Sequence, residues 1–213
     1  MYYLDDTPVT WLENKHVDAA AAKAAVDRLL PDGITHEARA FHAQLPRYEM
    51  TPLKRLGQLA SRLGVGSIWV KDESARFRLN AFKALGGSFA IYRLICEKVN
   101  RPNLSYADLM SEEIRAELGD ITFTSATDGN HGKGLAWATR KLGFACVIYV
   151  HKLTSAARIA AIAEYGAEVR VVDGNYDDAV RQCERGARAN GWQVVSDTSW
   201  PGYEEIPMAV MQG

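Results

Sequence analysis

A lysine in the stretch NAFKALGGSFA lies where an ordinary surface lysine would not be expected. If this stretch is helical, Lys83 shares one face with four small or apolar residues, Gly86, Gly87, Ala90 and Leu94. A glycine inside a helix costs about 1 kcal/mol relative to alanine, so the glycine pair indicates that another group, such as a flat cofactor, approaches the backbone closely. An amine among apolar groups loses hydration and becomes a better nucleophile and base. The pattern therefore favours a reactive lysine over one that extends its ammonium into water.

The segment TFTSATDGNHGKG, residues 122–134, contains a second group of side chains that could do chemistry. It is predicted to run from the end of a strand through a glycine-rich turn into a helix, and in an open parallel sheet this is where ligands bind. Here Asp128 could act as a base, and Asn130 could donate a hydrogen bond to a ligand oxygen. The segment matches neither the dinucleotide-binding pattern G-x-G-x-x-G nor a Walker loop. A purely structural glycine turn is the alternative.

The sequence contains no pattern typical of a metal or redox site. His131 has no second histidine or cysteine at the spacing of a metal site, so we interpret it as a capping or packing residue. The three cysteines, Cys96, Cys146 and Cys183, are far apart and odd in number, which favours buried thiols in a reducing compartment. We therefore expect no metal.

The composition is that of a globular protein with no electrostatic affinity for nucleic acid. The 213 residues are 47% hydrophobic and carry a formal net charge of -1, so a basic surface for nucleic acid or an anionic membrane is not expected. No apolar run approaches the length of a transmembrane helix, and the start of the chain does not resemble a secretion signal. We expect a soluble cytoplasmic protein that binds a small molecule.

The elements that must position these side chains alternate between helices and strands. Helices are predicted over residues 17–30, 35–45, 51–63, 81–99, 111–118, 135–142, 155–165 and 176–190, and strands over residues 67–73, 121–124, 146–150, 168–172 and 193–196. Residues 1–16 are expected to form an irregular arm, and residues 129–134 a glycine-rich turn. From residue 121 onward, strands alternate with helices of the length that right-handed crossover connections need. This pattern predicts an α/β fold with an open parallel sheet flanked by helices.

Four segments together resemble one family of pyridoxal-phosphate enzymes. They are NAFKALGGSFA, TSATDGNHGKGLAWA, NYDDAV and DTSWPGYEEIP, and they are similar to the diaminopropionate ammonia-lyase family, which belongs to fold type II, the tryptophan-synthase-β type. The resemblance covers most of the chain after about residue 45. It implies that Lys83 forms the covalent link to the cofactor, that Asn130 donates a hydrogen bond to the phenolic oxygen of the cofactor ring, and that Asp128 and Asp197 are the acid–base carboxylates. Without the resemblance, Asp197 would be interpreted as a helix cap or turn residue.

The resemblance also implies an activity. A family member would eliminate ammonia from 2,3-diaminopropionate, a small amino acid, and give pyruvate and ammonia, with pyridoxal 5'-phosphate as the electron sink. Family members are usually homodimers. Two alternatives remain: a serine or threonine dehydratase of the same fold, and a catalytically incompetent chain that acts as a binding module.

A division into two domains is a further implication of the resemblance. Residues 1–80 would form the N-terminal part of the large domain, and residues 81–213 the small α/β domain and the start of the return to the large domain. The glycine-rich loop that holds the cofactor phosphate in this family, and the polar partner of the pyridine nitrogen, are not identifiable in the sequence. We therefore expect that the chain is truncated at its C-terminus, holds only the lysine side of the site, and by itself binds the cofactor weakly.

Overall fold

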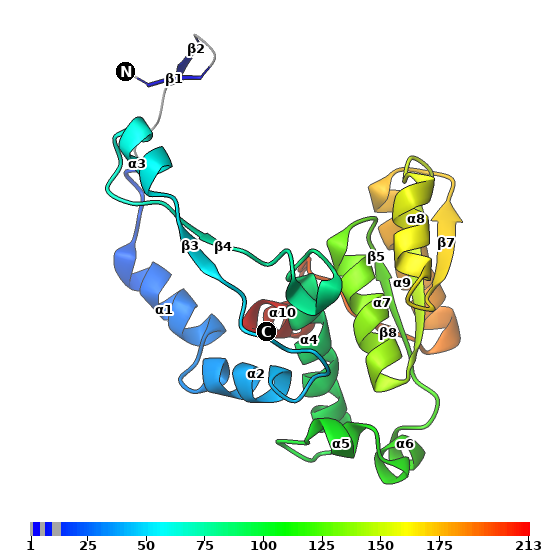
Figure 1. The fold of residues 1–213 in the computed structure, drawn as a ribbon. Coiled ribbons are helices and arrows are strands. Elements are labelled where there is room, and N and C mark those ends of the chain that lie inside the picture. Colours follow the sequence, from blue (N-terminus) through cyan, green and yellow to red (C-terminus); the bar gives the residue numbers. More distant parts are fainter. Residues whose placement is uncertain (1, 5–6, 10–13) are drawn as a thin grey trace.

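An open sheet of four parallel strands forms one side of the molecule (Figure 1). The computed structural model describes residues 2–4, 7–9 and 14–213. The strands lie in the order β7-β6-β5-β8, and every neighbouring pair is parallel. Their bounds are Thr122–Ala126 for β5, Ala145–His151 for β6, Glu168–Val172 for β7 and Gln193–Val194 for β8. The predicted α/β fold with an open parallel sheet is confirmed.

Three helices connect successive strands and cover both faces of this sheet. They are α7 (Asn130–Leu142), α8 (Ala156–Ala163) and α9 (Tyr176–Asn190). Helices α7 and α8 lie on one face and α9 on the other (Figure 1). Strand β5 contributes side chains to both faces, because Phe123 belongs to the main core and the Thr124 hydroxyl lies 3.5 Å from the Cys183 sulfur of α9. A strand that is buried on both faces is typical of a parallel sheet.

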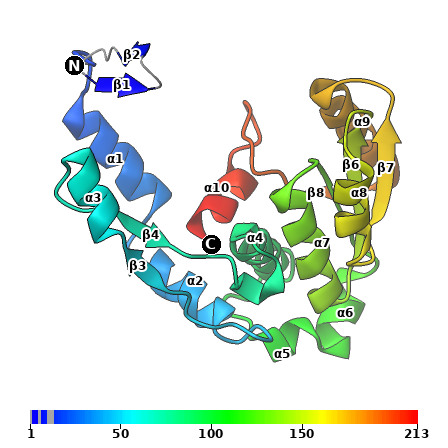
Figure 2. The same ribbon diagram turned by 45° about the horizontal axis from the view of Figure 1, so that its top comes forward.

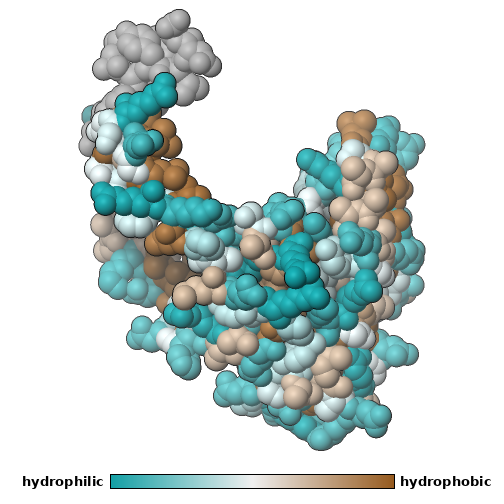
Figure 3. All heavy atoms as spheres, in the orientation of Figure 1, coloured by the Kyte–Doolittle hydropathy of each residue, from teal (hydrophilic) through white to brown (hydrophobic). Residues whose placement is uncertain are grey.

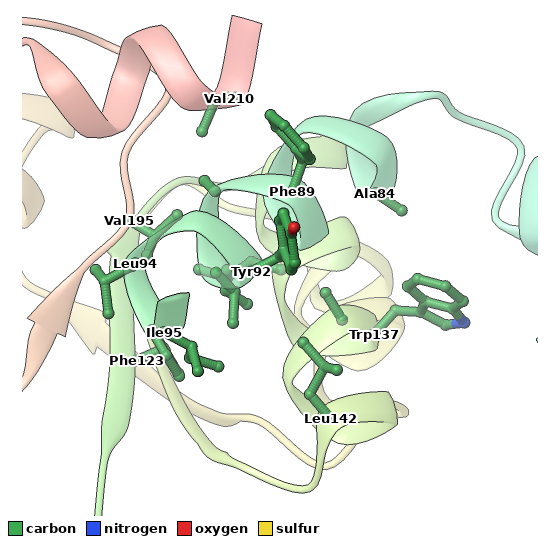
Figure 4. Close-up of a cluster of buried hydrophobic side chains, with 14 of the residues drawn as sticks. Ala84, Phe89, Tyr92, Leu94, Ile95, Phe123, Trp137, Leu142, Val195 and Val210 are labelled. Carbon is green, nitrogen blue, oxygen red and sulfur yellow. The ribbon is translucent and has the colours of Figure 1, made fainter. Parts of the chain in front are cut away.

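Helix α4 (Lys83–Lys98) lies between α7 and a further helix, α10 (Glu205–Gln212). Ten of its 16 residues are buried, and Phe89, Ile91 and Ile95 have no exposed surface. Figure 4 shows side chains from α4, α7 and α10 meeting in this cluster. A helix that is apolar on most sides is expected to be enclosed by its neighbours. A largely buried helix of this core therefore carries Lys83 as its first residue.

Two helices approach α4 so closely that no side chain fits at the points of contact. A Cβ atom added at Gly86 would overlap the backbone carbonyl oxygen of Val210 in α10, and one added at Gly134 in α7 would lie 2.7 Å from the backbone nitrogen of Ala84. At Gly87 the nearest atoms also belong to α7, at 3.8 Å. The predicted close approach to the glycine pair is therefore present at Gly86, where the approaching group is α10 and not a cofactor.

Two short helices, α5 (Tyr106–Leu109) and α6 (Glu112–Leu118), connect α4 to β5. Each begins with a serine side chain that accepts a hydrogen bond from a backbone N–H of its first turn, as an N-cap does. Helix α6 confirms the helix predicted over residues 111–118. Within the described part of the chain, we find no helix with both the length and the apolar character that crossing a membrane requires.

The N-terminal part of the chain forms an arm that extends away from the sheet (Figure 2). Its elements are β1 (Tyr2–Leu4), β2 (Thr7–Val9), α1 (Ala19–Leu29), α2 (Ile34–His42), β3 (Leu53–Arg55), α3 (Gly57–Leu63), β4 (Trp69–Lys71) and the 3-10 helix η1 (Arg76–Arg78). The strands form two antiparallel pairs, β1 with β2 and β3 with β4. The irregular arm predicted for residues 1–16 is therefore wrong for residues 2–4 and 7–9. Exposed apolar side chains such as Leu59, Leu63 and Trp69 lie on this arm, and Figure 3 shows a hollow between the arm and the rest of the molecule.

Two predicted helix starts are wrong. The helix predicted over residues 51–63 begins only at Gly57, because Thr51 does not cap it. The Thr51 hydroxyl instead donates to Glu73 and accepts a hydrogen bond from Arg76, at 3.0 Å. This long-range contact accompanies the pairing of β3 with β4. The glycine-rich turn predicted over residues 129–134 is the first part of α7, which begins at Asn130.

Alanine at the two neighbouring glycines of α4 tests the packing against α10. Gly86→Ala forces a methyl group against the Val210 backbone, whereas Gly87→Ala meets only ordinary van der Waals distances. Both variants gain about 1 kcal/mol of helix propensity, but only the first is over-packed, at a cost of about 1 to 3 kcal/mol. We expect Gly86→Ala to have the lower free energy of unfolding by about that difference in urea denaturation. Equal stabilities would contradict the close contact.

Candidate active site

Two of the predicted site residues are in direct contact at the carboxyl edge of the sheet. The Lys83 amine lies 2.8 Å from Oδ2 of Asp197, which follows β8. The lysine side chain is 34% exposed and the aspartate side chain 25%, so both groups can meet a ligand that enters from solvent. The expectation of a lysine among apolar groups alone is wrong, because its ammonium has a carboxylate partner.

His131, in the first turn of α7, completes this cluster from the buried side. Its Nε2 atom lies 2.9 Å from the backbone oxygen of Val195, and its Nδ1 atom lies 3.8 Å from Oδ2 of Asp197. The residue is 3% exposed, and Nδ1 has no hydrogen-bond partner among the described residues. His131 is thus buried, as predicted, but its place beside Asp197 was missed. From the sequence it is interpreted as a capping or packing residue, and no local pattern indicates a carboxylate that follows a distant strand.

The charges in this cluster follow from burial and from the neighbours of each group. Burial opposes ionisation of Asp197, but His131 and Lys83 outweigh it and hold the pKa of its carboxyl below the usual range. Burial lowers the pKa of His131, against the opposing effects of Asp197 and the Val195 carbonyl. The imidazole is therefore neutral at pH 7, and Lys83 is the cation that balances Asp197 at this pH.

Asp128 lies in the loop between β5 and α7 and is held by other partners. Its Oδ2 atom is 2.9 Å from the Arg158 guanidinium and 3.3 Å from Nε2 of His151. Asn130, at the start of α7, is exposed. The structure therefore pairs Lys83 with Asp197, and it leaves Asp128 in the adjoining loop and Asn130 at the start of α7.

Tyr176, at the start of α9, lies near both carboxylates, and sequence reasoning did not identify it. Its hydroxyl is 3.4 Å from the backbone oxygen of Ala126, at the end of β5. Burial raises the pKa of the Tyr176 phenol, and the charges of Asp197 and Asp128 raise it further. Both carboxylates therefore act on the same side chain, which indicates that they border one region of the sheet edge.

The side chains gathered at this edge of the sheet suit a cofactor that reacts with an amine. They offer the accessible amine of Lys83, two carboxylates and the exposed amide of Asn130, and a Cβ at Gly129 of the same loop would meet no atom within 4 Å. No group of three or more metal-binding side chains occurs in the residues that the structure describes. These residues fit an aldehyde cofactor held through Lys83.

Comparison with known sequences assigns the chain to an enzyme family. The profile of the pyridoxal-phosphate dependent enzyme family matches residues 45–211. The chain belongs to this family. Within it, the chain is 49% identical to the diaminopropionate ammonia-lyase of Salmonella typhimurium strain LT2 over 187 residues, which are 87% of this chain and 46% of that enzyme. The enzyme of Escherichia coli strain K12 is also 49% identical, over 83% of this chain and 44% of its own length.

Solved structures give the same result. The apo form of Escherichia coli diaminopropionate ammonia-lyase superposes with a TM-score of 0.79 and 46% identity, over 86% of this chain and 50% of that one. The same enzyme in complex with an aminoacrylate-PLP azomethine reaction intermediate superposes with a TM-score of 0.77, over 86% of this chain and 46% of that one. The chain thus spans about half the length of the relatives it matches, and the resemblance to this fold type II family is confirmed.

Acid titration of stability tests the environment of Asp197. Because its folded pKa lies below the unfolded value, the carboxylate contributes stability above about pH 3.9 that is lost as the pH falls through the depressed pKa. We expect Asp197→Asn to lose less free energy of unfolding than the unmodified protein between about pH 5 and about pH 2. Denaturant titrations at several pH values measure this. The control, Asp120→Asn in the exposed turn before β5, should follow the unmodified protein, and the same course for Asp197→Asn would contradict the assignment.

Proposed function

We propose that this chain forms part of a pyridoxal-phosphate-dependent lyase that eliminates ammonia from 2,3-diaminopropionate and gives pyruvate and ammonia. The observation that carries the proposal is the contact of Lys83 with Asp197 at the sheet edge, in a chain 49% identical to diaminopropionate ammonia-lyases. That the Escherichia coli relative was solved with an aminoacrylate-PLP azomethine reaction intermediate supports the same chemistry.

Each predicted site residue has a role in this proposal. Lys83 would hold the cofactor through its amine, which becomes nucleophilic once it has lost its proton. Asn130 would donate a hydrogen bond to the phenolic oxygen of the ring from the start of α7. Bound pyridoxal phosphate would supply an electron sink for the electron pair left when the α-proton is removed.

The two carboxylates would move the protons. Asp197 is ionised at neutral pH, since its pKa is lowered, and as a base in contact with Lys83 it would accept the α-proton of the substrate. Asp128, which Arg158 and His151 hold, would act from the adjoining loop, so that protons could be removed from either face. A proton given to the departing β-amine then releases ammonia.

The alternative of a serine or threonine dehydratase is less well supported. The L-threonine dehydratase of Salmonella typhimurium strain LT2 is 29% identical over 174 residues, against 49% for the ammonia-lyase of the same strain. A small amino-acid substrate is supported by the Escherichia coli relative solved in complex with D-serine. The other alternative, a catalytically incompetent chain that acts as a binding module, is not favoured by the 49% identity to ammonia-lyases.

The domain division, the oligomeric state and the cellular location are part of the same proposal. We assign residues 1–80 to the large domain and residues 81–213 to the small domain and the start of the return. A cytoplasmic homodimer is the form we propose for the active enzyme. The apolar side chains exposed on the N-terminal arm offer surface that such an assembly could cover.

Borohydride reduction of the cofactor-loaded protein, followed by peptide mass spectrometry, tests the role of Lys83. We expect the pyridoxyl group on Lys83, because the amine of Lys133 donates to the Leu79 carbonyl, at 3.2 Å, and that of Lys71 to the Thr51 carbonyl. Lys133→Arg should leave the labelling unchanged, and Lys83→Arg should abolish it. A label on Lys71 or Lys133 would refute the assignment.

Asp128→Asn separates a catalytic carboxylate from a structural turn residue. We expect pyruvate formation by the intact protein to fall by about 10² to 10⁴-fold, because the base is lost, while the visible absorbance of the bound cofactor stays near that of the unmodified protein. Asn130→Ala, the matched change on the same loop, should instead weaken cofactor loading. If turnover and absorbance fall together in Asp128→Asn, the residue only shapes the loop.

A further inference from the structure

We propose that His131 is a positioning residue that takes up, on Nδ1, the proton that Lys83 gives up, and then holds Asp197 in place by a hydrogen bond. The proposed function supplies the reason for Lys83 to lose its charge, since the amine must be neutral to bind a carbonyl carbon. The inference rests on that function only in this respect. The proton exchange itself belongs to the three side chains.

The hydrogen bond to Val195 fixes the tautomer of the neutral imidazole. A backbone carbonyl only accepts, so the Nε2 atom that lies 2.9 Å from it must carry the hydrogen. Nδ1 is then an unprotonated acceptor, buried, and without a partner among the described residues. Buried polar atoms without a hydrogen bond are exceptions in native proteins. The structure therefore holds an acceptor ready beside Asp197.

Lys83 and His131 face the same carboxylate oxygen. Oδ2 of Asp197 lies 2.8 Å from the lysine nitrogen and 3.8 Å from Nδ1. While the lysine is charged, it balances Asp197. Nδ1 and Oδ2 are then both acceptors, and they lie too far apart for a hydrogen bond. Once the lysine is neutral, the carboxylate lacks a cation, and a proton on Nδ1 restores an oppositely charged pair.

The exchange conserves charge and requires only a small movement. An N–H bond of Lys83 breaks, an N–H bond forms at Nδ1 of His131, and Oδ2 of Asp197 lies between the two as the relay. The net charge of the three groups is zero before and after. A charge-assisted hydrogen bond of about 2.7 to 2.9 Å then requires Nδ1 and Oδ2 to approach by about 1 Å, which rotation of the aspartate side chain can supply.

Other charged groups do not compete for this role. The groups whose charges act on His131 are Asp197 and Lys83, and Asp128 is already paired with the Arg158 guanidinium. Loss of the Lys83 charge raises the pKa of any imidazole at this place, but only a positioning histidine then carries a proton on Nδ1 at pH 7 and donates it to Asp197, whereas a histidine that merely packs keeps Nδ1 unprotonated. The protonation state of His131 therefore distinguishes positioning from packing.

Nitrogen NMR of the imidazole in the intact, cofactor-free protein measures this state. The unmodified protein should show a protonated Nε2 and an unprotonated Nδ1 at pH 7. In Lys83→Met the titration midpoint of His131 should rise by about one to three pH units, the effect of a carboxylate without a competing cation. The matched control, Lys133→Met on α7, should leave it unchanged.

Two more variants keep the test decisive. Lys83→Gln, which retains a donor to Asp197 without the charge, should raise the midpoint as Lys83→Met does, and it replaces that variant if the latter does not fold. Adding Asp197→Asn to either change should return His131 to the neutral ring. A midpoint in both Lys83 variants equal to that of Lys133→Met would overturn the inference.

This outcome is independent of the proposed function. If borohydride labels Lys83 and the His131 midpoint does not move, the proton exchange is wrong and the lyase proposal stands. If the midpoint rises and no label appears on Lys83, the cofactor assignment is wrong and the exchange stands.

Discussion

The backbone contact between α4 and α7 at Gly134 is the constraint on which the rest of the site depends. Without a side chain at this position, α7 lies directly against the backbone of Lys83 and Ala84, and the first turns of the two helices become neighbours. His131, one turn before Gly134, is then placed near Lys83, the first residue of α4. Strand β8 brings Asp197 by pairing with β5. Helix packing and strand order, rather than a local motif, assemble the three side chains.

Lys83, Asp197 and His131 differ in their exposure to water, and their electrostatic roles differ accordingly. Lys83 and Asp197 keep part of their contact with water, so their pair escapes the full desolvation cost of a buried ion pair. His131, which is almost fully buried, is the group that stays neutral. A lysine paired with a carboxylate is a weak nucleophile until it loses its proton, and the same carboxylate is the nearest group that can receive it. The resting arrangement therefore holds the amine in contact with the group that can receive its proton.

Features set by local pattern were predictable from the sequence, and features set by distant contacts were not. The alternation of strands and helices after residue 121 predicted the parallel sheet, and the small residues around Lys83 marked α4. Thr51 and Pro52 had the form of a helix start, but Glu73 and Arg76 engage Thr51, and the helix begins later. The glycines of α4 suggested a cofactor, whereas α10 and α7 fill that space. His131 was missed because its partners, Val195 and Asp197, lie far along the chain, after the last strand of the sheet.

The contact between Lys83 and Asp197 spans 114 residues of chain, and this separation sets an order of events during synthesis. A ribosome adds about 5 to 20 residues per second, so Asp197 is made about 6 to 23 s after Lys83. From the synthesis of β5 until that of β8, the edge of β5 that β8 pairs with in the finished sheet has open hydrogen-bonding groups. The nascent chain therefore passes through a stage in which the amine has no counter-ion and the sheet edge can pair with a neighbouring nascent chain.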